Sequence, residues 1–112
     1  MYIFKLFRIE EWLQFKALGK TDGAPIDMID GFIHFSKANQ VKETAAKHFK
    51  ADKDLILLSC NAENLKPDLK WEISRGGELF PHLYRELLLK DIEARYDLPK
   101  IDGLHKFPDI IS

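Results

Sequence analysis

One apolar run constrains the fold more than any other feature of the chain. Residues 55–60 read Leu-Ile-Leu-Leu-Ser-Cys and are bounded by charged and polar residues. A short run without alternation, flanked in this way, is typical of a β-strand that is buried on both faces. The chain is therefore expected to fold around a sheet in which this segment is a central strand.

Weaker patterns on either side predict a mixture of elements. Aromatic and branched residues predict three further strands, over residues 2–7, 31–35 and 69–74. Apolar residues at three- and four-residue spacing predict two short helices, over residues 9–18 and 37–49. Gly19 is placed to end the first helix, and Ser36 stands where the N-cap oxygen of the second helix belongs.

Three segments are less regular. Residues 20–29 contain Gly23 and Pro25 and are expected to form an irregular connection. Residues 82–95 fit either a helix or one or two strands, and the pattern leaves both open. The last segment, residues 98–112, is expected to be a tail packed by Leu104, Phe107 and Ile110. Together the elements predict one α+β domain over residues 1–112, with a mostly antiparallel sheet and two short helices from the N-terminal half.

The charge balance limits the kinds of binding partner that the chain favours, and the cysteine count indicates the redox compartment. There are 17 Lys and Arg against 18 Asp and Glu, a net charge of −1, so no basic excess favours an extended nucleic-acid backbone. No apolar run approaches the roughly 20 residues that cross a bilayer, and the first residues show no secretory cleavage pattern. A single cysteine, Cys60, excludes an internal disulfide and fits a reducing compartment. We therefore expect a cytoplasmic protein with no membrane partner.

The first motif is Asp-Gly-Phe-Ile-His-Phe-Ser at residues 30–36. Alternation puts Phe32 and His34 on one face of the predicted strand. A buried imidazole nitrogen without a partner costs about 1–3 kcal/mol, so His34 is either a core histidine with a hydrogen-bond partner or a donor that faces a ligand. The following helix N-terminus suits phosphate or carboxylate. Ser36 is interpreted as a helix cap or as a ligand-binding hydroxyl, and a hydrolase nucleophile is rejected because no Gly-x-Ser-x-Gly sequence surrounds it.

The second motif is the densest in the chain and runs Trp-Glu-Ile-Ser-Arg-Gly-Gly-Glu-Leu-Phe-Pro-His-Leu-Tyr-Arg over residues 71–85. It gathers six side chains that can bind a ligand: Trp71, Glu72, Arg75, His82, Tyr84 and Arg85. The glycine pair inside it predicts a turn and can also let N–H groups converge on an anion. The histidines and Glu72 lack a regular metal-ligand spacing, so no metal site is assigned.

These two motifs, with Gln-x-x-Glu-Thr-Ala-Ala-Lys at residues 40–47 between them, resemble a family of small bacterial proteins known as a domain of unknown function. The likeness covers the chain from Tyr2 to about Leu98. That family is grouped with the ADP-ribosyltransferase-like fold, whose split antiparallel sheet holds NAD in a cleft in its enzymatic members. The resemblance therefore implies such a sheet and makes NAD the ligand to test.

The resemblance also implies roles for single residues. His34 matches the early-strand position that holds the nicotinamide ribose, and Tyr84 matches a later position on the nicotinamide side. The late glutamate that stabilises the oxocarbenium-like state has two candidates, Glu86 and Glu93, and neither sits in a recognisable acidic motif.

The sequence and the resemblance together suggest a cleft that binds NAD or another small nucleotide-like anion. Its catalytic candidates are His34, His82 and Glu72, and its ligand-binding candidates are Ser36, Trp71, Arg75 and Tyr84. The reaction it suggests is ADP-ribosyl transfer or cleavage of an N-glycosidic bond, in which a carboxylate stabilises positive charge. The alternative is a non-catalytic binding or interaction module with structural histidines. The hypothesis requires the two imidazoles to meet beside a hollow that is open to solvent.

Overall fold

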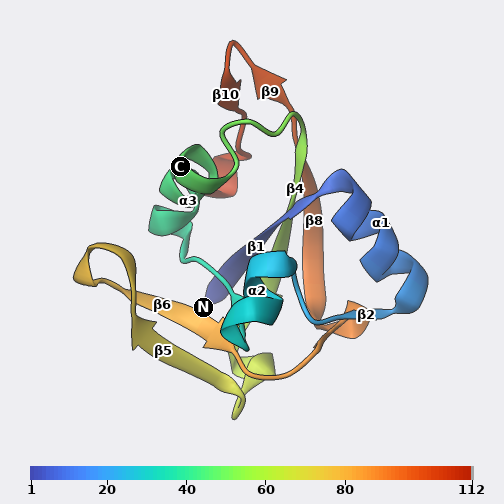
Figure 1. The fold of residues 1–112 in the computed structure, drawn as a ribbon, viewed down its shortest axis with the longest axis vertical. Coiled ribbons are helices and arrows are strands. Elements are labelled where there is room, and N and C mark those ends of the chain that lie inside the picture. The colour runs from blue at the N-terminus through green and yellow to red at the C-terminus, as the bar shows by residue number, and fades with distance from the viewer. Residues whose placement is uncertain (112) are drawn as a thin grey trace.

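A three-stranded antiparallel sheet forms the centre of the computed structural model, which describes residues 1–111 apart from the side chain of Arg75. Its strands lie in the order β1, β4, β8, with bounds Tyr2–Arg8, Leu55–Asn61 and Ile92–Leu98. The inner strand β4 carries the apolar run, and six of its seven residues are buried. The prediction of a central strand at residues 55–60 is confirmed (Figure 1).

A second three-stranded sheet lies beside the first and has the order β3, β6, β5. Its strands are Ile33–His34, Leu79–Leu83 and Leu69–Ile73. A backbone bridge between Phe4 and Ser36 joins β1 to the end of β3. Two minor pairs complete the strands: β2 (Lys20–Thr21) with β7 (Leu87–Leu88), and β9 (Lys100–Ile101) with β10 (Leu104–His105). All pairs among the described residues are antiparallel.

Three α-helices accompany the sheets: α1 (Ile9–Leu18), α2 (Pro25–Asp30) and α3 (Ala38–His48). Four short 3-10 helices occupy connections, at Ala62–Leu65, Arg75–Gly77, Leu89–Asp91 and Asp109–Ile111. The α+β class is confirmed, with three helices where two were predicted.

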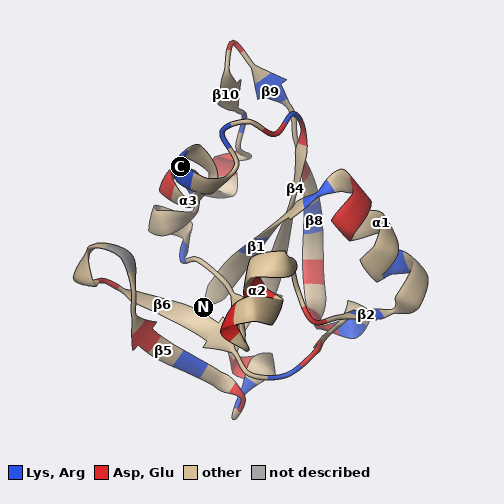
Figure 2. Cartoon of the chain, viewed as in Figure 1, with Lys and Arg blue, Asp and Glu red and all other residues tan. Residues whose placement is uncertain are grey.

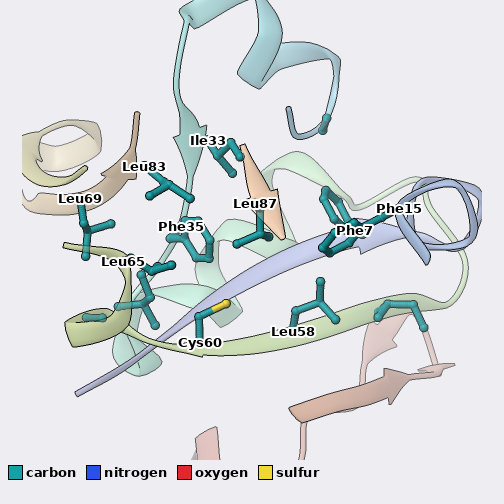
Figure 3. Close-up of a cluster of buried hydrophobic side chains, with 14 of the residues drawn as sticks. Phe7, Phe15, Ile33, Phe35, Leu58, Cys60, Leu65, Leu69, Leu83 and Leu87 are labelled. Carbon is teal, nitrogen blue, oxygen red and sulfur yellow. The ribbon is translucent and has the colours of Figure 1, made fainter. Parts of the chain in front are cut away.

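The core is divided by the central sheet, because alternate residues of β4 face opposite sides. Ile56, Leu58 and Cys60 join a cluster with α1 and with the β3–β6–β5 sheet. Figure 3 shows Leu58 and Cys60 of this cluster beneath Phe35 and Leu83. On the opposite face, Leu55 and Leu57 pack in a second cluster that includes Val41 and Ala45 of α3. The central strand is thus covered on both faces, which explains its unbroken apolar sequence.

Helix α2 corrects the prediction of an irregular connection at residues 20–29. Pro25 takes the first helical position and Gly31 ends the helix in a left-handed conformation. Proline inside the start and glycine just past the end of a helix are a recognised combination. Six residues are too few to show a clear apolar period, and Asp27 is the buried residue while Ile26, Met28 and Ile29 are exposed.

Ser36 does not cap α3, which corrects a second prediction. The N-cap position belongs to Lys37, whose backbone N–H donates to the Gln40 side chain at 3.0 Å. Ser36 is buried, and its hydroxyl lies 3.1 Å from the Thr44 hydroxyl. The bridge to Phe4 holds Ser36 in extended backbone one residue before the cap.

The C-terminal half resolves the ambiguity at residues 82–95 in favour of strands, since this range contains the end of β6, all of β7 and the start of β8. The tail also differs in its contacts. Leu104 and Ile110 are exposed, whereas Leu98 and Ile111 are buried in the second core cluster, with Phe107 packed against it. Leu104 instead belongs to the β9–β10 hairpin.

Candidate functional site

The two histidines of the motifs are cross-strand neighbours. Strand β3 pairs with β6 so that His34 stands directly opposite His82. Their ring centroids are 5.3 Å apart, and the ring planes meet at 71°. One β-ladder therefore brings together two histidines that are 48 positions apart in the sequence. This meets the first requirement of the cleft hypothesis, that the two imidazoles lie close together.

Phe32 completes an aromatic cluster with both imidazoles. Its ring stacks on His82 with centroids 4.1 Å apart and an interplanar angle of 28°. It also lies 4.6 Å from the ring of His34 and 5.2 Å from the ring of Tyr84. The alternation argument correctly put Phe32 and His34 on one face, but the contact between Phe32 and His82 depends on the strand register.

His34 is held by two carboxylates of α2. Its Nδ1 atom lies 2.6 Å from Asp27 Oδ1, and its Nε2 atom lies 3.0 Å from Asp30 Oδ2. The backbone N–H of His34 also donates to Asp27 at 3.1 Å. A ring that carries protons on both nitrogens donates to both carboxylates, so the local hydrogen-bond pattern suits an imidazolium. The side chain is about one-third exposed.

Asp27 is the buried anchor of this arrangement. Its second oxygen accepts hydrogen bonds from Lys5 Nζ and from the Ala24 backbone N–H, each at 2.7 Å. Burial raises the pKa of this carboxyl, but the hydrogen bond from His34 and the charge of Lys5 outweigh it and lower the pKa to about 2. Asp27 is therefore ionised at neutral pH and fixes His34 relative to the central sheet.

His82 has a different environment. Its Nδ1 atom lies 2.8 Å from Glu72 Oε1, which also accepts a hydrogen bond of 2.7 Å from the Tyr84 hydroxyl. The hydrogen bond from Tyr84, and next that from His82, lower the pKa of Glu72, while the bond to Glu72 raises the pKa of Tyr84. The Nε2 atom of His82 is the one buried side-chain nitrogen or oxygen among the described residues that has no hydrogen-bond partner.

A hollow of about 360 Å³ adjoins this cluster, but His34, His82 and Glu72 are not among its lining residues. Phe32 and Tyr84 line it from the aromatic cluster, and Asp22, Met28, Arg85 and Glu86 line it from the neighbouring segments. Its charged lining is mainly acidic, and Figure 2 marks acidic residues on α2. Arg85, the basic member, is already bound by Asp91 at 2.9 Å, and this hydrogen bond raises the pKa of its guanidinium.

A family model described as "Protein of unknown function (DUF952)" matches residues 6–95. The chain belongs to the DUF952 family. No curated protein matches it.

Solved structures of the bacterial protein CC0527 are similar to this DUF952 chain. The crystal structure of protein CC0527 from Caulobacter crescentus is 45% identical, with a TM-score of 0.93, and the match covers 99% of this chain and 98% of that one. The solution NMR structure of CC0527 gives 45% identity and a TM-score of 0.82, over 93% and 90% of the two chains. The shared fold thus extends over almost the whole length of both chains.

The DUF952 structure brings together four of the seven predicted site residues: His34, His82, Glu72 and Tyr84. Trp71 precedes Glu72 in β5, and alternation directs it to the opposite face of the sheet, with its partly exposed ring opposite Pro81. Ser36 is buried against Thr44 and is not among the residues that line this hollow. The side chain of Arg75 lies outside the described part of the structure.

The structure also separates the two late glutamates. Glu86 lines the hollow beside Tyr84, whereas Glu93 lines a different hollow on the central sheet. Sequence reasoning missed Asp27 and Lys5, since a buried ion pair between β1 and α2 has no local pattern. The signal for α2 itself was available in Pro25 and Gly31.

Residues 1–111 contain neither a metal-binding cluster nor a membrane-spanning helix. No group of three or more His, Cys, Asp or Glu side chains there is arranged to hold a metal ion. No helix in the same range has the length and apolar character that a membrane span demands.

Proposed function

We propose that the histidine pair and the adjoining hollow bind a small nucleotide-like molecule, with NAD as the first candidate. The observation that carries the proposal is the Nε2 atom of His82, which is buried and unpartnered among the described residues. Leaving a buried polar atom unpaired costs about 1–3 kcal/mol. Glu72 takes the proton-bearing Nδ1 side of the ring, which leaves Nε2 as a lone-pair acceptor for a ligand N–H or O–H group.

The lining of the hollow supports a planar ligand group. Phe32 and Tyr84 offer aromatic rings against which a base can stack. Asp22 and Glu86 supply carboxylates, which suit a cationic ring such as nicotinamide. A volume of about 360 Å³ is at the lower end of the usual 300–1,000 Å³ for ligand sites. This space fits one end of a dinucleotide, and the phosphates would lie outside it, toward Lys20 and Arg85.

A reaction follows from the same residues and from the resemblance to the ADP-ribosyltransferase-like fold. The bond between the ribose C1′ and the nicotinamide nitrogen would break, and an acceptor oxygen would form the new bond at C1′. Glu86, which lines the hollow, would stabilise the positive charge that develops on the ribose, and Glu72 is the second candidate for this role. His82 Nε2 is suited to take the proton from the acceptor hydroxyl.

A non-catalytic module with structural histidines is the second candidate, and His34 favours it. Both of its ring nitrogens already have carboxylate partners, Asp27 and Asp30. A histidine satisfied in this way connects α2 to the second sheet without any ligand. The histidines contribute to ligand binding in the first candidate function and only to stability in the second. Alanine variants of His34 and His82 therefore distinguish the two functions.

A thermal-shift screen with NAD, ADP-ribose, nicotinamide and nucleoside mono- and diphosphates tests binding. A ligand at a hundredfold excess over its dissociation constant stabilises the protein by about 2.7 kcal/mol, which is readily measured as a rise in Tm. No rise with any of these molecules would remove the nucleotide proposal. Release of free nicotinamide from NAD then separates an enzyme from a binder.

Alanine variants separate a site from a structural role. His82→Ala should abolish the ligand-induced rise in Tm, whereas His105→Ala, which removes a hydrogen bond to the Lys53 carbonyl in a distant hairpin, should not. A large loss of stability in His34→Ala and His82→Ala, with ligand binding unchanged in the folded fraction, would favour the structural alternative.

A further inference from the structure

A second hollow, of about 500 Å³, lies on the face of the central sheet against which α3 packs. Its floor is formed by Phe4, Ser59 and Ala94, from three adjacent strands. Its walls include Tyr2, Tyr96 and Ala38, the first residue of α3. It shares no lining residue with the hollow beside the histidines.

The strand register explains why this space exists. Phe4, Ser59 and Ala94 form one row across the sheet, and Leu6, Leu57 and Tyr96 form the next. The leucine row belongs to the core cluster that contains Val41 and Ala45 of α3. In the other row, serine and alanine stand where leucine would fill the layer, so the sheet surface is hollowed beside the helix.

Ser59 provides a polar group in this floor. The residue is 5% exposed and lines the hollow, and its hydroxyl makes no hydrogen bond to another described residue. Its Oγ atom is not fully buried, since it is absent from the fully buried polar atoms without a partner. The hydroxyl is therefore accessible from the hollow and available to a ligand that enters it.

Glu93 contributes a carboxylate to the lining of this hollow, and it lies at a β-bulge in β8. Ala94 stands opposite Ser59 and Ile92 stands opposite Cys60, so Glu93 is the extra residue of β8. Bulges redirect side chains and are frequent beside functional sites. Glu93 is exposed, lines the hollow, and forms no ion pair with the residues that the structure describes.

We propose that this second hollow binds a small planar aromatic molecule that carries a protonated amine. The tyrosine and phenylalanine rings provide the apolar and cation-attracting surface that an aromatic amine prefers. Glu93 selects the positive charge, because an anionic ligand would meet an uncompensated carboxylate. Ser59 provides a hydroxyl for a second polar group of the ligand. This site is independent of the function proposed for the histidines.

Three indole probes test the charge requirement on the intact chain: tryptamine, its neutral analogue tryptophol, and indole-3-acetate. Backbone ¹H–¹⁵N NMR spectra should show shifts at Ser59 and Ala94 with tryptamine. Tryptophol should bind more weakly, by up to about fivefold, as loss of one exposed ion pair predicts, and indole-3-acetate should leave these signals in place. Absence of shifts with tryptamine, or equal shifts with all three probes, would overturn the proposal.

Two variants and one control connect the binding to these residues. Glu93→Gln should weaken tryptamine binding by up to about fivefold and leave tryptophol binding unchanged. Ala94→Leu should fill the floor and abolish binding of both. Glu63→Gln, a change at an exposed glutamate paired with Lys66, should have no effect. Because Glu93 is exposed, its substitution tests the proposal even if Ala94→Leu fails to fold; unaltered tryptamine affinity in Glu93→Gln would contradict it.

Discussion

Lys5 and Asp27 form a buried ion pair that joins the central sheet to α2. Lys5 Nζ lies 2.7 Å from Asp27 Oδ2, and the two side chains are 6% and 0% exposed. The same carboxylate holds His34 through its other oxygen. The position of the first histidine thus depends on a charge pair that lies outside both sequence motifs.

Substitution of Asp27 by asparagine should strongly destabilise the protein. The change leaves the Lys5 ammonium buried without its counter-charge, and breaking a buried pair in this way typically costs about 3–5 kcal/mol. The free energy of unfolding in urea measures the loss. Glu63→Gln breaks the exposed pair with Lys66 and should cost less than about 1 kcal/mol. Equal effects of the two substitutions would show that Lys5 finds another partner.

Asp27 should also make stability depend on acid pH. Its pKa is about 2 in the folded protein against an ordinary value of 3.8, so the folded state holds fewer protons in this range. The resulting stabilisation, about 2 kcal/mol, is complete only above about pH 5 and is mostly lost as pH falls to about 2. Urea unfolding at several pH values should show the fall in the wild type, and a smaller fall in Asp27→Asn. An identical pH profile in the variant would contradict the assignment.

Gly23 should be intolerant of a side chain because of its contact with Asp27. Its φ is +98°, and an added Cβ would lie 2.2 Å from Asp27 Oδ2. Gly23→Ala therefore combines left-handed strain of about 1–2 kcal/mol with a clash against the buried carboxylate. Gly31→Ala is the matched control, since its φ is +84° but nothing lies within 4 Å of the added atom. Thermal unfolding should show the larger fall in Tm for Gly23→Ala, and a reversed order would exclude the predicted clash.

The hydroxyl of Tyr84 should report its hydrogen bond to Glu72. This bond raises the pKa of Tyr84 above its ordinary value of 10.0. Ultraviolet titration of tyrosinate should show a late-titrating group that is missing in Tyr84→Phe. Glu72→Gln keeps an acceptor but removes the charge, so Tyr84 should ionise at lower pH in that variant. A titration curve unaffected by Glu72→Gln would mean that the bond does not persist in solution.

Much of the fold could be predicted because its signals are local. The buried strand at residues 55–60 and the helix at residues 9–18 follow from runs and spacings within a few residues, and the structure confirms both. The helix at residues 25–30 was missed because its buried residue is an aspartate, whereas apolar periodicity expects hydrophobic residues inward. Ser36 was wrongly predicted to be the N-cap, which is Lys37. The local sequence does not show that Ser36 instead forms a backbone bridge with Phe4, one residue before the cap.

The candidate site was only partly visible for a similar reason. Alternation correctly grouped Phe32 with His34, since the two residues are two positions apart in one extended segment. Their contact with His82 depends on which residues of β3 and β6 stand opposite each other, and turn and register geometry determine this. Asp27 and Lys5 are brought in by tertiary packing alone, and no spacing in the sequence connects them.

The most direct test of the proposed site is ¹⁵N NMR of the His82 imidazole during a titration with NAD. In the free protein, Nδ1 should carry a proton, because the Glu72 carboxylate accepts a hydrogen bond there, and the proposal requires Nε2 to carry none, because it uses that atom as an acceptor. Binding should shift the Nε2 signal together with the backbone amides of Phe32 and Leu83, and these shifts should saturate. A ring signal that stays unchanged with NAD and with every other nucleotide in the screen would contradict the account.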